Sequence, residues 1–303
     1  MSQNFRFETE QGPFFLKQYR NRLNHVMYEI KTAEEFFAAQ GLPIIAPIKD
    51  KHGRPGFWFD GHWLSIFPFI LGASPRFGEM NQNTAHSIGF TLGRFHRVGR
   101  RFPEQHFQHL KLWDKRKFDM EKIELVDLLS RKTNLTPMET LIMDILKIKT
   151  ALIEKNHLQP SDIPMPFNCL LHGDLTYQNV FVNASGEVTH VYDLEKACLG
   201  PRAYELGRSL VINCFDDGWD KRQIGLAQTF LSAYQEIMPI TFEEFSLGLR
   251  MYFADIIHMT WIEAKYVIYQ EEQQLALYER HANRVMRVNE GRLEDIPHQI
   301  YVG

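Results

Sequence analysis

The sequence predicts an α+β protein with a small antiparallel sheet in its N-terminal part and a larger helical C-terminal part. Three observations support this prediction. Runs of β-forming residues occur in pairs before residue 70, apolar residues recur at helical spacing after residue 80, and one further hairpin lies inside the helical part. The chain has 303 residues, 44% of them hydrophobic, so it can bury one large core or two smaller ones, and this length favours about two domains.

The predicted sheet is built from two β-hairpins. β-Forming residues alternate or cluster at 4–9 and 13–19, and Glu10-Gln11-Gly12 between them is typical of a turn. A second pair of runs lies at 57–60 and 63–69. These four runs are expected to be the strands of the N-terminal part.

Helices are predicted from apolar periodicity and from residues that favour helix ends. The first runs from about Leu23 to Gln40 and ends at Gly41, which is a typical C-cap. The other helices lie in the C-terminal part and are expected at 84–98, 115–130, 137–155, 223–237, 242–270 and 271–290.

Composition excludes several classes of protein. The net charge of −3 argues against nucleic-acid binding, which requires a strong basic excess or a clustered basic face. No apolar run approaches the ~20 residues needed to span a bilayer. Cys169, Cys198 and Cys214 are odd in number and lack metal-ligand spacing, so we expect reduced, buried thiols. A cytoplasmic protein without a nucleic-acid or membrane partner is therefore expected.

The most informative stretch runs from Leu170 to Glu195. It contains Asp174, Asn179 and Asp193 on short loops around a predicted hairpin at 180–192. A tight hairpin brings the residues that flank its open end together. We therefore expect Asn179 and Asp193 to lie side by side, with Asp174 one loop earlier. The alternative explanation is that polar residues merely cap a buried hairpin.

This set of side chains suits phosphoryl transfer from ATP. The reaction needs a carboxylate that orients and deprotonates the attacking hydroxyl, and an amide with a second carboxylate that hold Mg²⁺ on the phosphate oxygens. In the protein-kinase catalytic loop, an Asn follows the catalytic Asp by five residues. Asp174 and Asn179 have the same spacing.

His172-Gly173-Asp174, followed by Asn179 and by an apolar strand that ends in Asp193-Leu194-Glu195, resembles a known motif. It is similar to that of the aminoglycoside phosphotransferase, choline kinase and type II homoserine kinase family, within the kinase-like superfamily. The resemblance implies a two-lobed, protein-kinase-like fold with a nucleotide-binding lobe at 1–70 and a helical catalytic and acceptor-binding lobe at 71–303. It also implies an ATP-dependent phosphotransferase that acts on a hydroxyl of a small molecule.

The resemblance implies a role for each residue of the motif. Asp174 would be catalytic, and ATP and Mg²⁺ would be the cofactors. Asn179 and Asp193 would bind the metal, and Glu195 would assist them. Asp174 would act by orienting the acceptor more than as a strong base, because the transition state of phosphoryl transfer is loose.

By itself, Lys17 is a lysine between aromatic residues, which is usually an edge residue with its charged end in water. The resemblance implies instead that Lys17 contacts the α- and β-phosphates and is held by a glutamate of the next helix. Glu29 is the preferred partner. Glu34 and Glu35 lie on the same helix and stay open as partners, although a solvated helix face is the favoured explanation for these two.

The adenine site is implied near the end of the second hairpin. The run Leu64–Ile70, ended by Gly72, falls where the family places the hinge between its lobes. Backbone groups near Phe67 and Phe69 would then face the adenine edge. Relatives have a further strand before the first hairpin, together with a loop that covers the phosphates. In this chain that first strand is expected to be missing, and the loop shortened or absent.

Two further segments resemble parts of the family. Gly200–Gly207 is similar to a segment whose Asp braces the catalytic loop, and here Glu205 takes that position. One long helix is implied to face the acceptor. Its polar and aromatic residues are Asp255, His258, Trp261, Glu263 and Tyr266, although aromatics in the core and acids in solvent are the favoured alternative.

Three functions are consistent with these features. The first is a small-molecule kinase. The second is a Ser/Thr protein kinase, because Phe14–Arg20 and Leu92–His96 are among the pieces that resemble a bacterial stress-response kinase group. The third is a nucleotide-binding pseudokinase or scaffold, suggested by the missing strand. Fold resemblance transmits chemistry better than substrate choice, so the acceptor is not identified.

Overall fold

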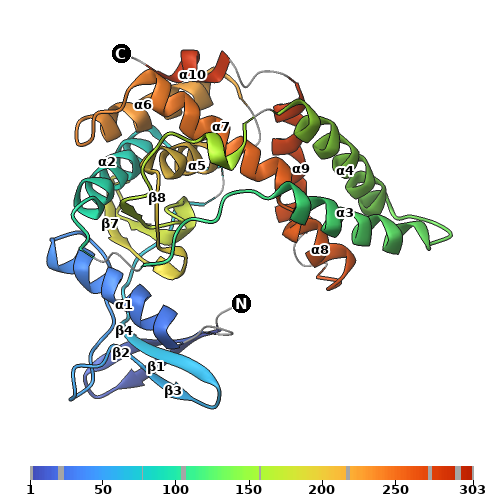
Figure 1. Cartoon of the computed structure of the whole chain (residues 1–303). Coiled ribbons are helices and arrows are strands. Elements are labelled where there is room, and N and C mark those ends of the chain that lie inside the picture. Colours follow the sequence, from blue (N-terminus) through green and yellow to red (C-terminus); the bar gives the residue numbers. More distant parts are fainter. Residues whose placement is uncertain are drawn as a thin grey trace.

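The computed structural model describes residues 3–19, 24–76, 78–103, 107–156, 158–215, 219–271, 275–290 and 295–301. In this part of the chain a small antiparallel sheet with one helix lies at one end, and a larger group of helices lies at the other (Figure 1). This arrangement confirms the predicted α+β class. No helix among the described residues has the length and apolar character needed to cross a membrane. All three cysteines are buried, as predicted.

The N-terminal strands pair as the two predicted hairpins. They are β1 (Gln3–Thr9), β2 (Gly12–Tyr19), β3 (Phe57–Phe59) and β4 (His62–Pro68). Among the described residues they form an antiparallel sheet with the order β1-β2-β4-β3. Helix α1 (Asn24–Ala39) follows β2 and ends, as predicted, just before Gly41, whose φ of +72° few other residues adopt.

One face of this sheet is directed toward α1. Tyr19 and Trp63 are paired across β2 and β4 and are almost fully buried on this face. Lys17 and Ser65 are the next pair on the same face, because side chains two residues apart in a strand point the same way. The sheet therefore presents Lys17 from the side that α1 covers.

The C-terminal part consists mainly of helices. They are α2 (Gln82–Gly99), α3 (Lys115–Ser130), α4 (Pro137–Lys155), α5 (Arg202–Cys214), α6 (Lys221–Gln235), α7 (Phe242–His258), α8 (Trp261–Val267), α9 (Leu275–Asn289) and α10 (Asp295–Ile300). Helices α3 and α4 begin and end where the sequence predicts, and Asp114 and Thr136 cap their first turns.

Short strands and 3₁₀ turns carry the Leu170–Glu195 stretch. They are β5 (Cys169–Leu171), η2 (Tyr177–Asn179), β6 (Val180–Val182), β7 (Val188–Val191), η3 (Leu194–Lys196) and β8 (Cys198–Gly200), with η1 (Pro160–Asp162) further upstream. Strand β5 pairs with β8, and β6 pairs with β7 as the predicted hairpin. Backbone hydrogen bonds from Val191 to Pro43 (2.7 Å) and from Val182 to Ala73 (3.0 Å) attach this hairpin to the segments after α1 and β4.

The helix predicted at 242–270 is in fact two helices, α7 and α8. The chain is extended at Met259, with φ −75° and ψ 137°. The Met259 carbonyl accepts a hydrogen bond from Lys149 Nζ (2.7 Å), and the Thr260 hydroxyl donates to Glu121. Side chains from α3 and α4 therefore form hydrogen bonds with the polar groups at the break. Apolar periodicity within 242–270 does not reveal these contacts, so the sequence predicted one continuous helix.

Helices α4, α8 and α9 enclose a buried polar cluster. Lys149 forms a fully buried ion pair with Glu263, and His281 Nε2 lies 3.6 Å from the same carboxylate. Burial lowers the pKa of His281 to about 4, helped by the nearby charge of Lys149. Glu263 was expected near the acceptor, but it belongs to this cluster because α8 turns it toward α4.

Acid should destabilise the protein through His281. The unfolded histidine has a pKa near 6.5, so the unfolded state binds the proton more readily between pH 6.5 and about 4. Stability present above pH 6.5 is therefore lost as the pH falls through this window, by roughly 3 kcal/mol at pH 4. Urea unfolding at a series of pH values measures this loss for the wild type and for His281→Leu.

The loss of stability with falling pH must be compared between the wild type and His281→Leu. Burial also lowers the pKa of His172 and His258, so these residues contribute to the loss in both proteins. The His281→Leu variant should lose less stability per pH unit. Equal slopes for the two proteins would show that His281 does not titrate in this way.

Candidate active site

Hydrogen bonds to Glu205 hold the loop that carries Asp174. This buried carboxylate of α5 accepts hydrogen bonds from the backbone N–H groups of His172 (3.1 Å) and Gly173, and it lies 3.0 Å from His96 Nε2. Burial would raise the pKa of Glu205, but these donors lower it and keep the group ionised. Glu205 therefore occupies the bracing position that the sequence suggested.

His172 and Gly173 fix the path of the same loop. The His172 ring is fully buried, its Nδ1 accepts from the Asp174 N–H (3.2 Å), and its Nε2 donates to the Tyr192 carbonyl (3.1 Å). Gly173 has a φ of +81°, and a Cβ there would lie 2.0 Å from the Lys196 carbonyl oxygen. Only glycine allows the loop to pass this close to η3.

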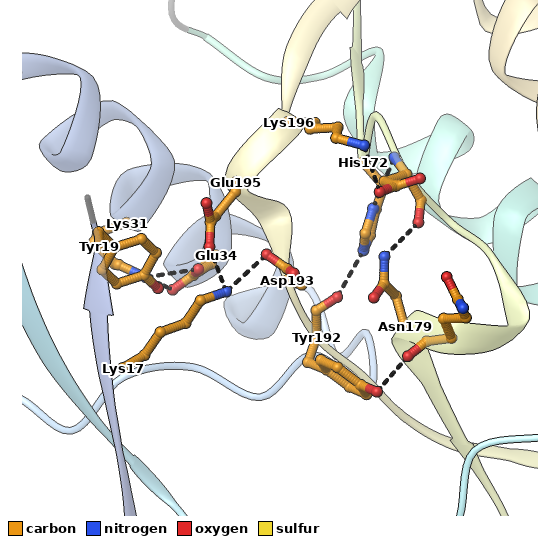
Figure 2. A network of polar contacts seen from close by, with 12 residues as sticks. Lys17, Tyr19, Lys31, Glu34, His172, Asn179, Tyr192, Asp193, Glu195 and Lys196 are labelled. Carbon is orange, nitrogen blue, oxygen red and sulfur yellow. Dashed lines mark hydrogen bonds and ion pairs between the residues drawn. The ribbon is translucent and has the colours of Figure 1, made fainter. Parts of the chain in front are cut away.

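The hairpin β6–β7 brings Asn179 and Asp193 to the same end. The Tyr192 N–H donates to the Asn179 carbonyl (3.0 Å), so the residues just before and just after the hairpin are neighbours (Figure 2). The Asn179 amide donates to the Asp174 carbonyl (2.8 Å), which directs its side chain into the site. Asp193 has a φ of +67° and turns the chain into η3, where Glu195 follows.

The donor set at this end suits a hard cation such as Mg²⁺. Asn179, Asp193 and Glu195 supply amide and carboxylate oxygens, which are the ligands that Mg²⁺ prefers. Among the described residues, however, no three His, Cys, Asp or Glu side chains are grouped so that they could hold a metal. A cation here therefore needs further oxygens, and Mg²⁺ commonly takes these from water and from substrate phosphates.

Lys17 lies against this donor set. Its Nζ forms ion pairs with Asp193 Oδ1 (2.8 Å) and Glu195 Oε1 (2.6 Å), as Figure 2 shows. Burial would lower the pKa of Lys17, but these two carboxylates raise it and keep the ammonium charged. The strand β2 and the turn η3 are far apart in sequence, so only the folded chain brings these groups together.

The predicted pairing of Lys17 with Glu29 is wrong. Among the described residues, the carboxylates paired with Lys17 are those of Asp193 and Glu195. Glu34 is the residue of α1 that reaches the site, and it lies about 140° from Glu29 around the helix, because the two are five positions apart. The solvated face expected for Glu34 is also wrong, whereas Glu35 does lie at the surface, paired with Lys49 (2.8 Å).

Glu34 is part of a buried network behind Lys17. Both of its oxygens accept hydrogen bonds from Lys31 (2.8 and 2.9 Å), which also donates to the Tyr19 hydroxyl (2.7 Å). Burial raises the pKa of Glu34 despite the neighbouring lysines. Tyr19, Lys31 and Glu34 form a polar wall between the sheet and α1 (Figure 2).

A cavity of about 380 Å³ opens in front of this wall, a volume typical of small-molecule sites. Phe15, Lys17 and Tyr19 border it on the sheet side, and Phe181 and Tyr192, with ring centroids 4.9 Å apart, border it on the hairpin side. The remaining lining residues are Asn4, Glu34, Ile45, Phe67, Pro68, Phe69, Ile70, Gly72 and Asp193. Phe67 and Phe69 thus both line the cavity in which an adenine was expected.

Asp174 is joined to the hairpin end of the site through Asn179, and 22% of its side chain is exposed. Arg208 donates to its Oδ1 (2.6 Å), and Lys196 donates to its Oδ2 (2.8 Å). Burial would raise the pKa of Asp174, but the two cations outweigh burial and hold the pKa well below its usual range. The carboxylate is therefore ionised at any physiological pH.

Sequence reasoning missed both Arg208 and Lys196. Lys196 directly follows the Asp193-Leu194-Glu195 motif, and Arg208 lies three residues after Glu205, on the same side of α5. Their positions relative to the motif and to Glu205 are the only local signals that could have drawn attention to these two residues. Their contact with Asp174 depends on the packing of η3 and α5 against the loop that carries Asp174.

Among the residues expected to face the acceptor, Asp255 lies near the two cations that contact Asp174. Asp255 of α7 accepts a hydrogen bond from the Tyr204 hydroxyl (2.9 Å), and burial raises its pKa while the charges of Arg208 and Lys196 oppose that shift. His258 instead packs between Trp113 and Phe118 as part of the core. Asp216 and Asp217, two acids that the sequence places after α5, lie outside the described residues.

A sequence profile of the phosphotransferase enzyme family (APH) matches residues 1–243, which is most of the chain. The chain belongs to this family. Among curated protein sequences, none matches it significantly. Membership confirms the predicted enzyme class, a phosphotransferase, and leaves the acceptor unspecified.

Solved structures of phosphotransferases share the fold. An amicoumacin kinase in complex with AMP-PNP and Ca²⁺ has a TM-score of 0.68 at 13% identity, over 95% of this chain and 86% of that one. An aminoglycoside phosphotransferase from Alicyclobacillus acidocaldarius has a TM-score of 0.65 at 16% identity, over 97% and 89%. A microcompartment-associated aminopropanol kinase has a TM-score of 0.64 at 16% identity, over 97% and 90%.

Proposed function

We propose that this phosphotransferase transfers the γ-phosphoryl group of ATP to a hydroxyl group of a small molecule, with Mg²⁺ as the metal. The observation that carries the proposal is the order of groups along the site. An aromatic cavity is followed by Lys17, then by Asp193 and Asn179, and finally by Asp174. This order matches adenine, phosphates, metal and acceptor.

The cavity would take the nucleotide. Phe67 and Phe69 would contact the adenine, and Lys17 would neutralise charge on the phosphates. Glu34 shares the cavity with Lys17, so it takes the place of Glu29 in the nucleotide-binding set. The amicoumacin kinase of similar fold was solved with a nucleotide analogue, which supports nucleotide binding.

Asn179, Asp193 and Glu195 would hold the metal. Bound between these oxygens and the phosphates, Mg²⁺ would neutralise the charge that develops during transfer. The protein residues fix the direction of the phosphates, since the Asn179 amide is anchored to the Asp174 backbone. The amicoumacin kinase complex contains Ca²⁺ as well as AMP-PNP, which supports the binding of a divalent ion together with the nucleotide.

Asp174 would position the acceptor hydroxyl and accept its proton. Its low pKa makes it a weak base, so its main contribution is orientation. Orientation suits a loose transition state, in which the acceptor proton is lost late. A small-molecule acceptor agrees with the names of the neighbours, which act on antibiotics or on aminopropanol.

The division of the chain follows from the same proposal. The nucleotide-binding lobe would span 1–70 and the helical lobe 71–303, with the boundary at Ile70, which lines the cavity. A cytoplasmic location would suit an enzyme that consumes ATP and contains buried cysteines.

Binding of ATP with Mg²⁺ should stabilise the protein. At a concentration of roughly 100 times Kd, the melting temperature should rise by about 3–6 °C, and less without Mg²⁺. Lys17→Met should lose most of this rise, because it removes the phosphate partner. Lys49→Met, which removes an exposed lysine paired with Glu35, is the control.

Turnover is then tested with labelled ATP and a panel of hydroxyl compounds that includes amino alcohols, sugars, hydroxy acids and a Ser/Thr peptide. Transfer to one class of small molecule is expected. The proposal fails if Mg²⁺ and ATP change neither the melting temperature nor the yield of labelled product.

A further inference from the structure

The two cations on Asp174 differ in their freedom to move. Arg208 comes from the middle of α5, and only 16% of its side chain is exposed. Lys196 ends the short turn η3, and 59% of its side chain is exposed. If one of the two must leave the carboxylate, it is Lys196, because its flexible side chain is already largely in water.

Lys196 is also placed along the path of the phosphates. Lys17 and Lys196 lie on opposite sides of Asp193 in Figure 2. Lys17 lines the cavity, and Lys196 pairs with Asp174. A triphosphate that runs from the cavity toward Asp174 would therefore meet Lys17 first and Lys196 second. Its α- and β-phosphates would then be near Lys17, and its γ-phosphate near Lys196.

The structure contains a conflict at Asp174. The carboxylate must accept a hydrogen bond from the acceptor hydroxyl, but Arg208 holds one oxygen and Lys196 holds the other. Each carboxylate oxygen can accept a second hydrogen bond, but two paired cations make Asp174 a poorer acceptor for the hydroxyl and its proton, so the withdrawal of one cation makes it a better partner. A γ-phosphate carries more negative charge than a carboxylate, so it competes well for a mobile ammonium group.

We propose that Lys196 exchanges Asp174 for the γ-phosphate when ATP binds, which frees Asp174 Oδ2 for the acceptor hydroxyl. This inference rests on the proposed function. Lys196 then contacts the reacting phosphoryl group and is a catalytic residue, whereas Arg208 stays on Oδ1 and is a positioning residue. In the same way, Lys17 exchanges Asp193 for the α- and β-phosphates.

The transfer step balances without a further reactant. The acceptor oxygen forms a bond to the γ-phosphorus, and the bond from that phosphorus to the bridging oxygen of ADP breaks, so ADP leaves with the electron pair. The hydroxyl proton passes to Asp174 Oδ2. Lys196 keeps its protons and stabilises charge on the phosphoryl oxygens during the transfer.

The exchange is tested by binding, which needs no knowledge of the acceptor. Calorimetry gives Kd for Mg²⁺ with AMP-PNP and for Mg²⁺ with ADP. Lys196→Met should weaken AMP-PNP binding by about tenfold, the typical effect of one charge-assisted contact. Binding of ADP should change by less than about twofold, because ADP lacks the γ-phosphate.

The matched control is Lys147→Met, which removes an exposed lysine paired with Asp144 on α4 (3.0 Å) and should change neither affinity. An unchanged ratio of the two affinities in Lys196→Met would overturn the exchange. If wild-type protein bound neither nucleotide, the proposed function itself would fail, so the two failures are distinguishable.

Kinetics provide a second readout once an acceptor is known. Lys196→Met should lower kcat by about tenfold to 100-fold with little change in the KM of the acceptor, and Lys196→Arg should recover part of the loss. A variant with unchanged kcat and a raised acceptor KM would show that Lys196 binds the acceptor, which would contradict the exchange.

Discussion

Asp174→Asn should lower kcat by about 1,000-fold or more, while the affinity for ATP with Mg²⁺ stays within about threefold. The asparagine amide cannot accept the hydroxyl proton, and it no longer neutralises Arg208 and Lys196. Nucleotide affinity survives because Asp174 lies beyond the cavity, and the metal oxygens of Asn179 and Asp193 are unchanged. Labelled ATP with the acceptor measures turnover, and calorimetry measures affinity.

Asp144→Asn is the matched control for this prediction. Asp144 is exposed on α4 and pairs with one lysine, so its loss should leave kcat unchanged. A wild-type kcat in Asp174→Asn would remove Asp174 from the catalytic role. A loss of nucleotide affinity equal to the loss of kcat would instead place it in nucleotide binding.

Glu205→Ala should destabilise the fold by about 3–5 kcal/mol and abolish most activity. The change leaves the His172 and Gly173 N–H groups and the His96 ring without their acceptor. Each buried donor left unpaired costs about 1–3 kcal/mol. The catalytic loop also loses the contact that fixes Asp174 relative to Asn179, so orientation is lost with stability. Urea unfolding measures the first effect and turnover the second.

Glu205→Asp keeps the test decisive if the alanine variant does not fold. The shorter acid retains the charge but must shift by about one methylene, so we expect a smaller destabilisation and a partial loss of kcat. Glu154→Ala, at an exposed position of α4, is the control. Unchanged unfolding and turnover in both Glu205 variants would show that the loop is held by other contacts.

Much of the fold follows from local sequence. The starts of α3 and α4 follow from local sequence because Asp114 and Thr136 cap them, and the hairpin β6–β7 was predictable from β-forming runs around a turn. The break between α7 and α8 was not, because its cause is Lys149, more than a hundred positions away. Helix α5 was also missed, since the sequence was interpreted there only as a motif.

The same distinction holds in the active site. Asp174, Asn179 and Asp193 lie within one hairpin and its flanks, so spacing and the motif were enough to propose them and to predict that Asn179 and Asp193 lie side by side. The choice between Glu29 and Glu34 depends on how α1 is rotated against the sheet, which no local pattern in α1 decides. The partners of Asp174 come from η3 and α5, whose packing against the catalytic loop is a tertiary contact.

The sequence by itself therefore determined the class of chemistry, because the groups proposed to react lie within about twenty residues, in and around one hairpin. The tertiary structure decided which charges surround those groups: Asp193 and Glu195 at Lys17, Lys31 at Glu34, and Arg208 with Lys196 at Asp174. The physical reason is that hydrogen-bonding and turn preferences act over a few residues, whereas an ion pair requires only that two side chains meet in the folded chain.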